Sequence, residues 1–191
     1  MKEQKLDARE RILQATMALL LEHKSASAVT NRQIAEKAGV NSALINYYYQ
    51  SKENLINKAA ALCIEQMTGT LFENNEASAP EERLRTLIKI ITDFLFDHYD
   101  LGALTISAEL KTGSLTTIRT LLPIIREHYQ NTKADDVLKL IALQIIAPLQ
   151  VIFLNLHGYR DFLGVDVFQK KERDRVLDTV IDNALRCTAR L

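Results

Sequence analysis

The chain has few of the residues that interrupt helices. Its 191 residues include three prolines, six glycines, two cysteines and no tryptophan. Because proline and glycine end or weaken helices, long stretches without them favour an all-α fold. The two cysteines, Cys63 and Cys187, are too few and too far apart for a disulfide framework. We expect them to serve as packing residues, with a redox switch as the alternative.

Signals of catalysis and of membrane insertion are also scarce. The four histidines stand singly, without metal-site spacing. The sequence has no glycine-rich phosphate loop and no nucleophile elbow. We therefore expect no enzyme, no metal and no cofactor. The N-terminus has no apolar core of a signal peptide, and the most apolar run, Leu138–Leu156, is interrupted by Lys139 and Pro148. We expect a cytoplasmic protein.

The chain has no net charge, but its charged residues are unevenly distributed. The formal net charge is zero. Residues 1–60 hold nine Lys and Arg against six Asp and Glu, whereas the remainder holds fifteen against eighteen. The N-terminal part is therefore basic by three charges, which suits a surface that attracts phosphates.

Residues 30–55 have the pattern of two short helices joined by a tight turn and followed by a third. Thr30 and Gln33 match a capping box, and Gly39 stands where a left-handed residue ends a helix. Asn41 and Ser51 are placed to cap the next two helices. The expected inward positions are Ile34, Ala35, Ala38, Leu44, Ile45 and Tyr48. This layout predicts a helix-turn-helix, whose second helix enters a DNA major groove.

Four short runs of this region also match a known pattern. They are Arg11-Ile12-Leu13-Gln14-Ala15-Thr16, Gly39-Val40-Asn41, Leu44-Ile45-Asn46-Tyr47-Tyr48-Tyr49 and Ser51-Lys52-Glu53-Asn54-Leu55. Over residues 7–58 the chain resembles the TetR family of bacterial regulators. Asn46 stands where that family usually has an aromatic residue, and Tyr49 replaces its usual phenylalanine. The resemblance implies that a ligand in the C-terminal domain changes the separation of two recognition helices through the helix that begins at Ser51.

The outward face of the second helix is the candidate DNA-binding surface. Small Ser, Ala and Asn side chains let a helix sit deep in a groove, where Asn can pair with adenine. Tyrosine hydroxyls and a lysine at a helix start can reach phosphates. The residues predicted to contact DNA, as the resemblance also implies, are Thr30, Asn31, Arg32, Asn41, Ser42, Ala43, Asn46, Tyr47, Tyr48 and Lys52. For the aromatic residues the alternative is a small core.

Apolar spacing and caps predict the other helices. The expected spans are 7–23, 51–72, 78–98, 101–110, 114–130, 134–157 and 166–189. In the first of these, the expected inward stripe is Ile12, Leu13, Met17, Leu20 and Leu21. A loop containing Gly158 and Gly164 should separate the last two helices. The run Lys170–Arg175 mixes charges of both signs and predicts a solvated helix face.

The remaining predictions concern the last two helices and the polar residues of the C-terminal part. Apolar stripes at Ile141–Leu156 and Val176–Leu185 predict a homodimer through these helices, with Ile181 and Leu185 at the interface. Polar groups within apolar helices need a hydrogen bond from protein, water or ligand. The candidate ligand-binding residues are Phe94, His98, Tyr99, Glu109, Gln144, Gln150, Phe153, Asn155 and His157. For each, the alternative is core or interface packing.

The sequence as a whole predicts an all-α, homodimeric transcriptional regulator. Residues 1–56 form a three-helix DNA-binding domain, and residues 57–191 form a helical domain that dimerises and senses a small molecule. No cluster of like charges occurs in these later helices, which favours a hydrophobic or amphipathic effector over a charged one. We expect repression of a near-palindromic operator, relieved by the ligand. Two alternatives remain: a ligand-free DNA-binding or partner-binding module with a packed core, and an enzyme with a clustered polar site in residues 80–160.

Overall fold

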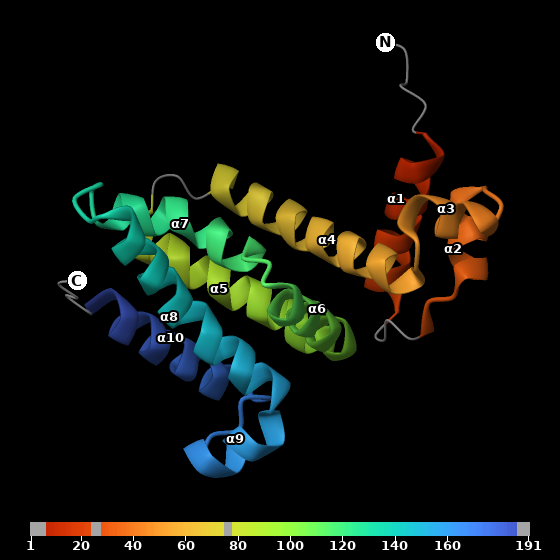
Figure 1. The fold of residues 1–191 in the computed structure, drawn as a ribbon. Coiled ribbons are helices and arrows are strands. Elements are labelled where there is room, and N and C mark those ends of the chain that lie inside the picture. Colours follow the sequence, from red (N-terminus) through yellow and green to blue (C-terminus); the bar gives the residue numbers. More distant parts are fainter. Residues whose placement is uncertain (1–6, 24–27, 75–77, 187–191) are drawn as a thin grey trace. The chain divides into compact units, whose positions relative to one another are not determined.

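The computed structural model describes residues 7–23, 28–74 and 78–186, and the chain in these ranges is built from ten helices without strands (Figure 1). The helices are α1 Ala8–Glu22, α2 Asn31–Ala38, α3 Ala43–Tyr49, α4 Lys52–Asn74, α5 Pro80–Asp97, α6 Tyr99–Thr112, α7 Thr116–His128, α8 Asp135–Leu154, α9 Leu156–Leu163 and α10 Lys170–Arg186. The predicted all-α fold is confirmed.

The chain divides into two compact units. Unit one comprises Met1–Gly69 and Asp97–Thr105, and unit two comprises Thr70–Phe96 and Ile106–Leu191. The expected boundary after residue 56 differs from this division in two ways. The N-terminal unit extends along α4 to Gly69, and it includes the first part of α6.

In unit one, α1 packs against both α2 and α3. The helix begins as predicted, because Asp7 and Glu10 form a reciprocal capping box. Its inward stripe is partly different from the expected one. Leu21 is exposed rather than buried, whereas Thr16 is fully buried and its Oγ1 donates to the Ile12 carbonyl at 2.7 Å. The backbone oxygen of the preceding turn thus satisfies a polar group inside the core.

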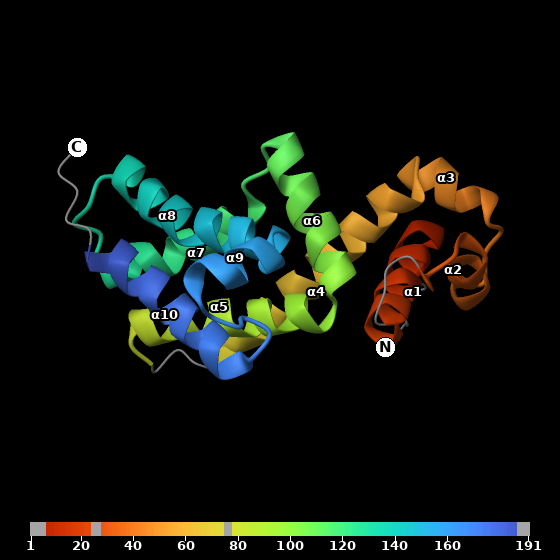
Figure 2. The same ribbon diagram turned by 90° about the horizontal axis from the view of Figure 1, so that it is seen from below.

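In unit two, α8 packs against α7 and α10. Figure 2 shows these three helices from below. It is long and apolar enough to cross a membrane by length and composition alone. However, 44% of its most apolar window is buried inside the protein. Seven of its apolar side chains lie in the core, namely Val137, Leu138, Ile141, Ala142, Ile145, Ile146 and Phe153. This burial identifies α8 as a core helix.

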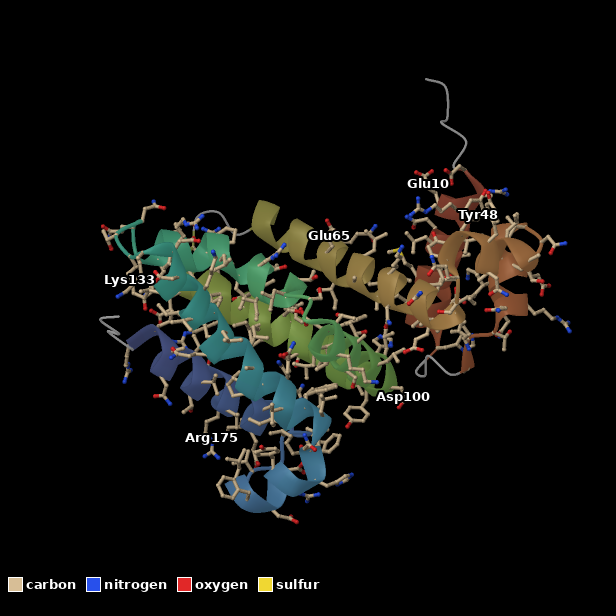
Figure 3. The ribbon with its side chains drawn as sticks, in the orientation of Figure 1. Glu10, Tyr48, Glu65, Asp100, Lys133 and Arg175 are labelled. Carbon is tan, nitrogen blue, oxygen red and sulfur yellow. The ribbon has the colours of Figure 1, made fainter. Side chains whose placement is uncertain are left out.

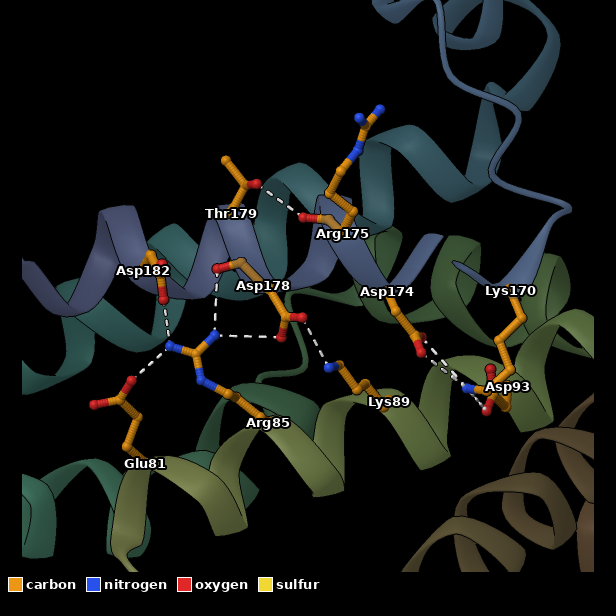
Figure 4. Close-up of polar contacts among 10 residues, drawn as sticks. All are labelled: Glu81, Arg85, Lys89, Asp93, Lys170, Asp174, Arg175, Asp178, Thr179 and Asp182. Carbon is orange, nitrogen blue, oxygen red and sulfur yellow. Dashed lines mark hydrogen bonds and ion pairs between the residues drawn. The ribbon is translucent and has the colours of Figure 1, made fainter. Parts of the chain in front are cut away.

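Ion pairs join α5 to α10 along their length (Figure 4). The Arg85 guanidinium pairs with Asp178 and Asp182 of α10, and Asp93 accepts from Lys170 and Arg173, each at 2.6 Å. The prediction of a solvated face at Lys170–Arg175 is therefore wrong for Arg173. Only 7% of Arg173 is exposed, and its guanidinium lies 4.4 Å from the centre of the Phe96 ring.

The last third of the chain contains a helix that the sequence pattern missed. The expected loop between Gly158 and Gly164 is wrong, because residues Leu156–Leu163 form α9. Gly164, with φ of 62°, ends this helix in the left-handed conformation. Helix α8 accordingly ends at Leu154 rather than at residue 157. The predicted end of the last helix, near residue 189, lies outside the described residues.

Candidate DNA-binding site

The helix-turn-helix has the local geometry that its sequence predicts. Thr30 and Gln33 form a capping box, and Gly39 ends α2 with φ of 62°. The Val40 N–H donates to the Ala35 carbonyl at 3.0 Å, which closes a Schellman motif around the glycine. Ile34, Ala35 and Ala38 are buried. The turn between α2 and α3 is therefore fixed by backbone hydrogen bonds.

The buried side of the recognition helix α3 differs slightly from the expected one. Ile45 and Tyr49 are its buried residues, spaced four apart, whereas Leu44 and Tyr48 are half-buried. The Asn41 side chain accepts from the Ala43 N–H at 2.9 Å, so it closes a turn before the helix. The residue directly before α3 is Ser42, whose side chain makes no capping bond. The expectation that Asn41 caps the helix is therefore wrong, because Ser42 holds the capping position.

The predicted DNA-contacting side chains of this turn and helix lie on the solvent side. Asn41, Ser42, Ala43, Asn46 and Tyr47 are exposed, and Tyr47 is 77% exposed. Tyr48 packs edge-on against Tyr47 with ring centroids 5.0 Å apart. Figure 3 labels Tyr48 on α3 and Glu10 on α1. Exposed polar groups on one side of a short helix are available to base edges and phosphates.

The remaining predicted DNA contacts lie at the starts of α4 and α2. The Ser51 hydroxyl accepts from the Asn54 N–H at 3.1 Å, which confirms the cap before α4 and leaves Lys52 in its first turn. At the start of α2, Thr30 and Arg32 are exposed and Asn31 is half-buried. Helix N-termini offer free backbone N–H groups to an anion, so these positions suit phosphates.

Two residues of this unit are outside the predicted site but hold it together. Tyr49 is only 3% exposed, and burial raises the pKa of its phenol. Its hydroxyl donates to the Arg9 carbonyl of α1 at 2.8 Å. Arg11 Nη1 donates to the carbonyls of Ala38 and Gly39 at 3.1 and 3.4 Å. The spacing of Tyr49 four residues after Ile45 was the available signal for its burial.

The candidate ligand-binding residues belong to both units. His98 and Tyr99 lie in unit one, and the other seven lie in unit two. Phe94 and Phe153 are buried, and Phe153 packs edge-on against Phe96 at 5.2 Å between centroids. Three of the polar candidates, Gln144, Asn155 and His157, are exposed in the single chain.

The structure brings two of the polar candidates together. Gln150 Nε2 donates to Glu109 Oε2 at 2.9 Å. The Glu109 carboxylate also accepts from the Thr117 N–H at 2.9 Å and from the Thr117 hydroxyl at 2.8 Å. Leu115, the residue before α7, has no side-chain capping bond, so Glu109 supplies a carboxylate to this helix start from α6. One carboxylate therefore joins α6, α7 and α8.

Among the described residues, no group of three or more His, Cys, Asp and Glu side chains could hold a metal ion. The polar groups described above belong to a helix-turn-helix surface and to hydrogen bonds between helices. This arrangement defines a DNA-binding protein.

Comparison with known proteins indicates which family of DNA-binding proteins the chain is similar to. Residues 12–59 match the family model described as bacterial regulatory proteins, tetR family. No curated protein matches the chain. The matched residues include α2, α3 and the start of α4, which hold the predicted DNA contacts. Over these residues the DNA-binding part of the chain is that of the TetR family of transcriptional regulators, which are not enzymes.

Solved structures share the fold over nearly the whole chain. A TetR transcriptional regulator from Rhodococcus sp. RHA1 is 17% identical, with a TM-score of 0.68 over 95% of this chain and 98% of its own. FadR of Thermus thermophilus, a repressor solved with lauroyl-CoA, is 16% identical, with a TM-score of 0.69 over 96% of both chains. FadR of Bacillus subtilis, solved with stearoyl-CoA, is 16% identical, with a TM-score of 0.59 over 94% and 99%.

Proposed function

We propose that this regulator is a homodimeric, cytoplasmic repressor that a small hydrophobic or amphipathic ligand releases from a near-palindromic operator. The observation that carries the DNA-binding part is the solvent-exposed face of α3 beside two capped helix starts. In this proposal Asn41, Ser42, Ala43 and Asn46 meet base edges, while Thr30, Asn31, Arg32, Tyr47, Tyr48 and Lys52 meet phosphates or the groove edge.

The proposed dimer interface is the outer face of α8. From Leu140 to Leu154 this helix has no charged residue. Leu140, Leu143 and Val151 are each about two-fifths exposed, at 40%, 43% and 40%, and their spacing puts them on one side of the helix. A second copy of the chain fits such a stripe, because a two-fold axis sets the same apolar face against itself. Ile181 is fully buried in its own chain and is no longer a candidate for the interface.

The ligand proposal rests on the composition of unit two. Phe94 and Phe153 supply buried apolar surface, and the linked Glu109 and Gln150 supply polar groups that could orient a headgroup. The two FadR structures, which carry lauroyl-CoA and stearoyl-CoA, support fatty acyl thioesters as the first ligand class to test. A ligand releases the operator only if it prefers the dimer whose recognition helices are wrongly spaced.

The test begins with an operator, obtained by selecting duplexes that the wild-type protein retains from a random pool. Binding of this operator is then measured by fluorescence anisotropy with lauroyl-CoA, stearoyl-CoA, laurate or free coenzyme A added. We expect an acylated compound to weaken operator binding while free coenzyme A does not. Failure to retain any duplex would contradict DNA binding. Operator binding that no compound changes would favour the ligand-free module.

A further inference from the structure

One turn of α1 contacts the ends of both helices of the helix-turn-helix. Arg11 reaches the carbonyl of Ala38, the last residue of α2, and that of Gly39, its C-cap, through a single nitrogen. These carbonyls carry the partial negative charge of a helix C-terminus, so a guanidinium both bonds them and compensates the charge. A Cβ built on Gly39 would lie 3.6 Å from the same nitrogen, which shows how closely the guanidinium covers the turn.

The second contact comes from the end of the recognition helix. Tyr49 is the last residue of α3, and its hydroxyl donates to the carbonyl of Arg9, two residues before Arg11. Lys58 of α4 lies 5.6 Å from the centre of the Tyr49 ring. The phenol is therefore held between α1 and α4, with its hydroxyl directed at one backbone oxygen.

We propose that Arg11 and Tyr49 are positioning residues for operator recognition, and we call them together the α1 clamp. The clamp fixes the C-terminal ends of α2 and α3 to neighbouring residues of one rigid helix. It thereby sets the angle between the two helices and the pose in which α3 meets the groove. Neither residue needs to touch DNA for this role.

Loss of the clamp and loss of a phosphate contact should affect DNA affinity differently. Base readout depends on a pose accurate to a fraction of an ångström, whereas non-specific binding depends mainly on charge near the phosphates. Loss of the clamp should therefore weaken specific binding and spare non-specific binding. Loss of a phosphate contact should weaken both by the same factor and reduce the salt dependence.

The experiment compares Arg11→Met, Arg11→Lys and Tyr49→Phe in the full chain. Affinity is measured across salt concentrations for the selected operator and for a scrambled duplex of equal length and composition. We expect Arg11→Met to weaken operator binding about tenfold, with an unchanged salt slope and unchanged affinity for the scrambled duplex. Arg11→Lys should recover part of the loss, because an ammonium can still donate to one carbonyl. Tyr49→Phe, which removes one hydroxyl, should show a smaller loss of the same kind.

Two variants in unit two serve as matched controls. Arg119→Met removes an exposed guanidinium from α7, and Tyr159→Phe removes a phenolic hydroxyl from α9. Both should bind the operator like the wild type. Circular dichroism and thermal unfolding establish that each variant is folded at the assay temperature. If Arg11→Met does not fold, Arg11→Lys and Tyr49→Phe decide the question.

Two results would overturn the proposal. A salt slope lowered by about one, with equal losses on both duplexes, would make Arg11 a phosphate contact. Folded variants with wild-type affinity for the operator would show that the clamp does not set the pose of α3.

Discussion

Three consecutive tyrosines of α3 show how position on a helix decides the role of a residue. Tyr47 is 77% exposed, Tyr48 is half-buried and Tyr49 is 3% exposed. Successive residues of a helix point about 100° apart, so three neighbours cannot all face the core. Tyr49 faces the core and binds α1, which leaves Tyr47 and Tyr48 for the solvent side. A single residue type therefore supplies both a structural hydrogen bond and candidate DNA contacts.

Lys52 gives a test of the phosphate contacts at the same scale. Replacing it by Ala should weaken binding to the selected operator and to the scrambled duplex by the same factor. The salt slope should fall by about one, because one fewer counterion is released from the DNA. The affinity of both duplexes measured across salt concentrations checks this expectation. Lys111→Ala, an exposed lysine of α6, is the control and should leave both quantities unchanged. An unchanged slope in Lys52→Ala would remove Lys52 from the site.

Residue-level prediction succeeded where local chemistry fixes the conformation. The capping pair Thr30 and Gln33, the left-handed Gly39 and the Ser51 cap depend on neighbours within a few positions, so the sequence contains the whole cause. The solvent side of α8, where Gln144 is exposed, was not predictable in this way. Residues 140–154 are apolar on nearly every side, so their periodicity does not determine which side faces solvent.

At the scale of whole elements, the ion pairs between α5 and α10 are the least predictable feature of unit two. The charged run at the start of α10 has the composition of a solvated face, but its partners lie some 80 residues away on α5. Sequence spacing within α10 contains no information about α5. Arg173 also donates to the carbonyls of Val167 and Phe168, so it anchors the segment between α9 and α10 as well.

The stability that Asp93 contributes to this network should depend on pH. Its partial burial acts to raise the pKa of the carboxyl, but hydrogen bonds from Arg173 and Lys170 outweigh it and hold the pKa below its usual value. A carboxyl whose pKa is lower in the folded state adds stability above its unfolded pKa, near about 3.9, and that stability is lost as the pH falls through the folded pKa. We therefore expect Asp93→Asn to be less stable than the wild type at neutral pH. The difference in free energy of unfolding should shrink as the pH falls below about 4.

Urea unfolding at fixed protein concentration, repeated from neutral to acid pH, measures this difference. Asp161→Asn is the matched control, because Asp161 is exposed on α9 and the change also removes one carboxylate. The control should follow the wild-type curve. A difference between Asp93→Asn and the wild type that stays constant down to pH 3 would show that the charge of Asp93 contributes nothing to stability.

At the scale of the molecule, the helices of the helix-turn-helix lie where the sequence predicts them, whereas the compact unit that contains them extends beyond residue 56. The family resemblance covers residues 7–58, and the predicted domain boundary follows residue 56. The compact unit instead runs to Gly69 and takes in Asp97–Thr105. That second segment joins the unit through contacts between residues far apart in the chain, and local periodicity does not encode such contacts. The helices were therefore predictable, but their grouping was not.

The assembly of two chains is the remaining prediction at this scale. Leu143→Asp places a charge in the middle of the exposed apolar stripe of α8. In a two-fold interface the charge would face its own copy or an apolar surface, and either contact costs several kcal/mol. We expect the variant to sediment as a monomer at micromolar concentration, where the wild type is a dimer. Its operator affinity should also fall, because one dimer no longer holds both half-sites.

Leu110→Asp is the matched control, since Leu110 is an exposed leucine of α6 rather than of α8. Both positions are already solvent-exposed in the single chain, so neither substitution should reduce helix content. A dimeric Leu110→Asp beside a monomeric Leu143→Asp would assign the interface to α8. A wild-type protein that sediments as a monomer at micromolar concentration would contradict the dimer itself. Operator binding would then have to come from independent chains, each of which reads one half-site with the affinity of a single recognition helix.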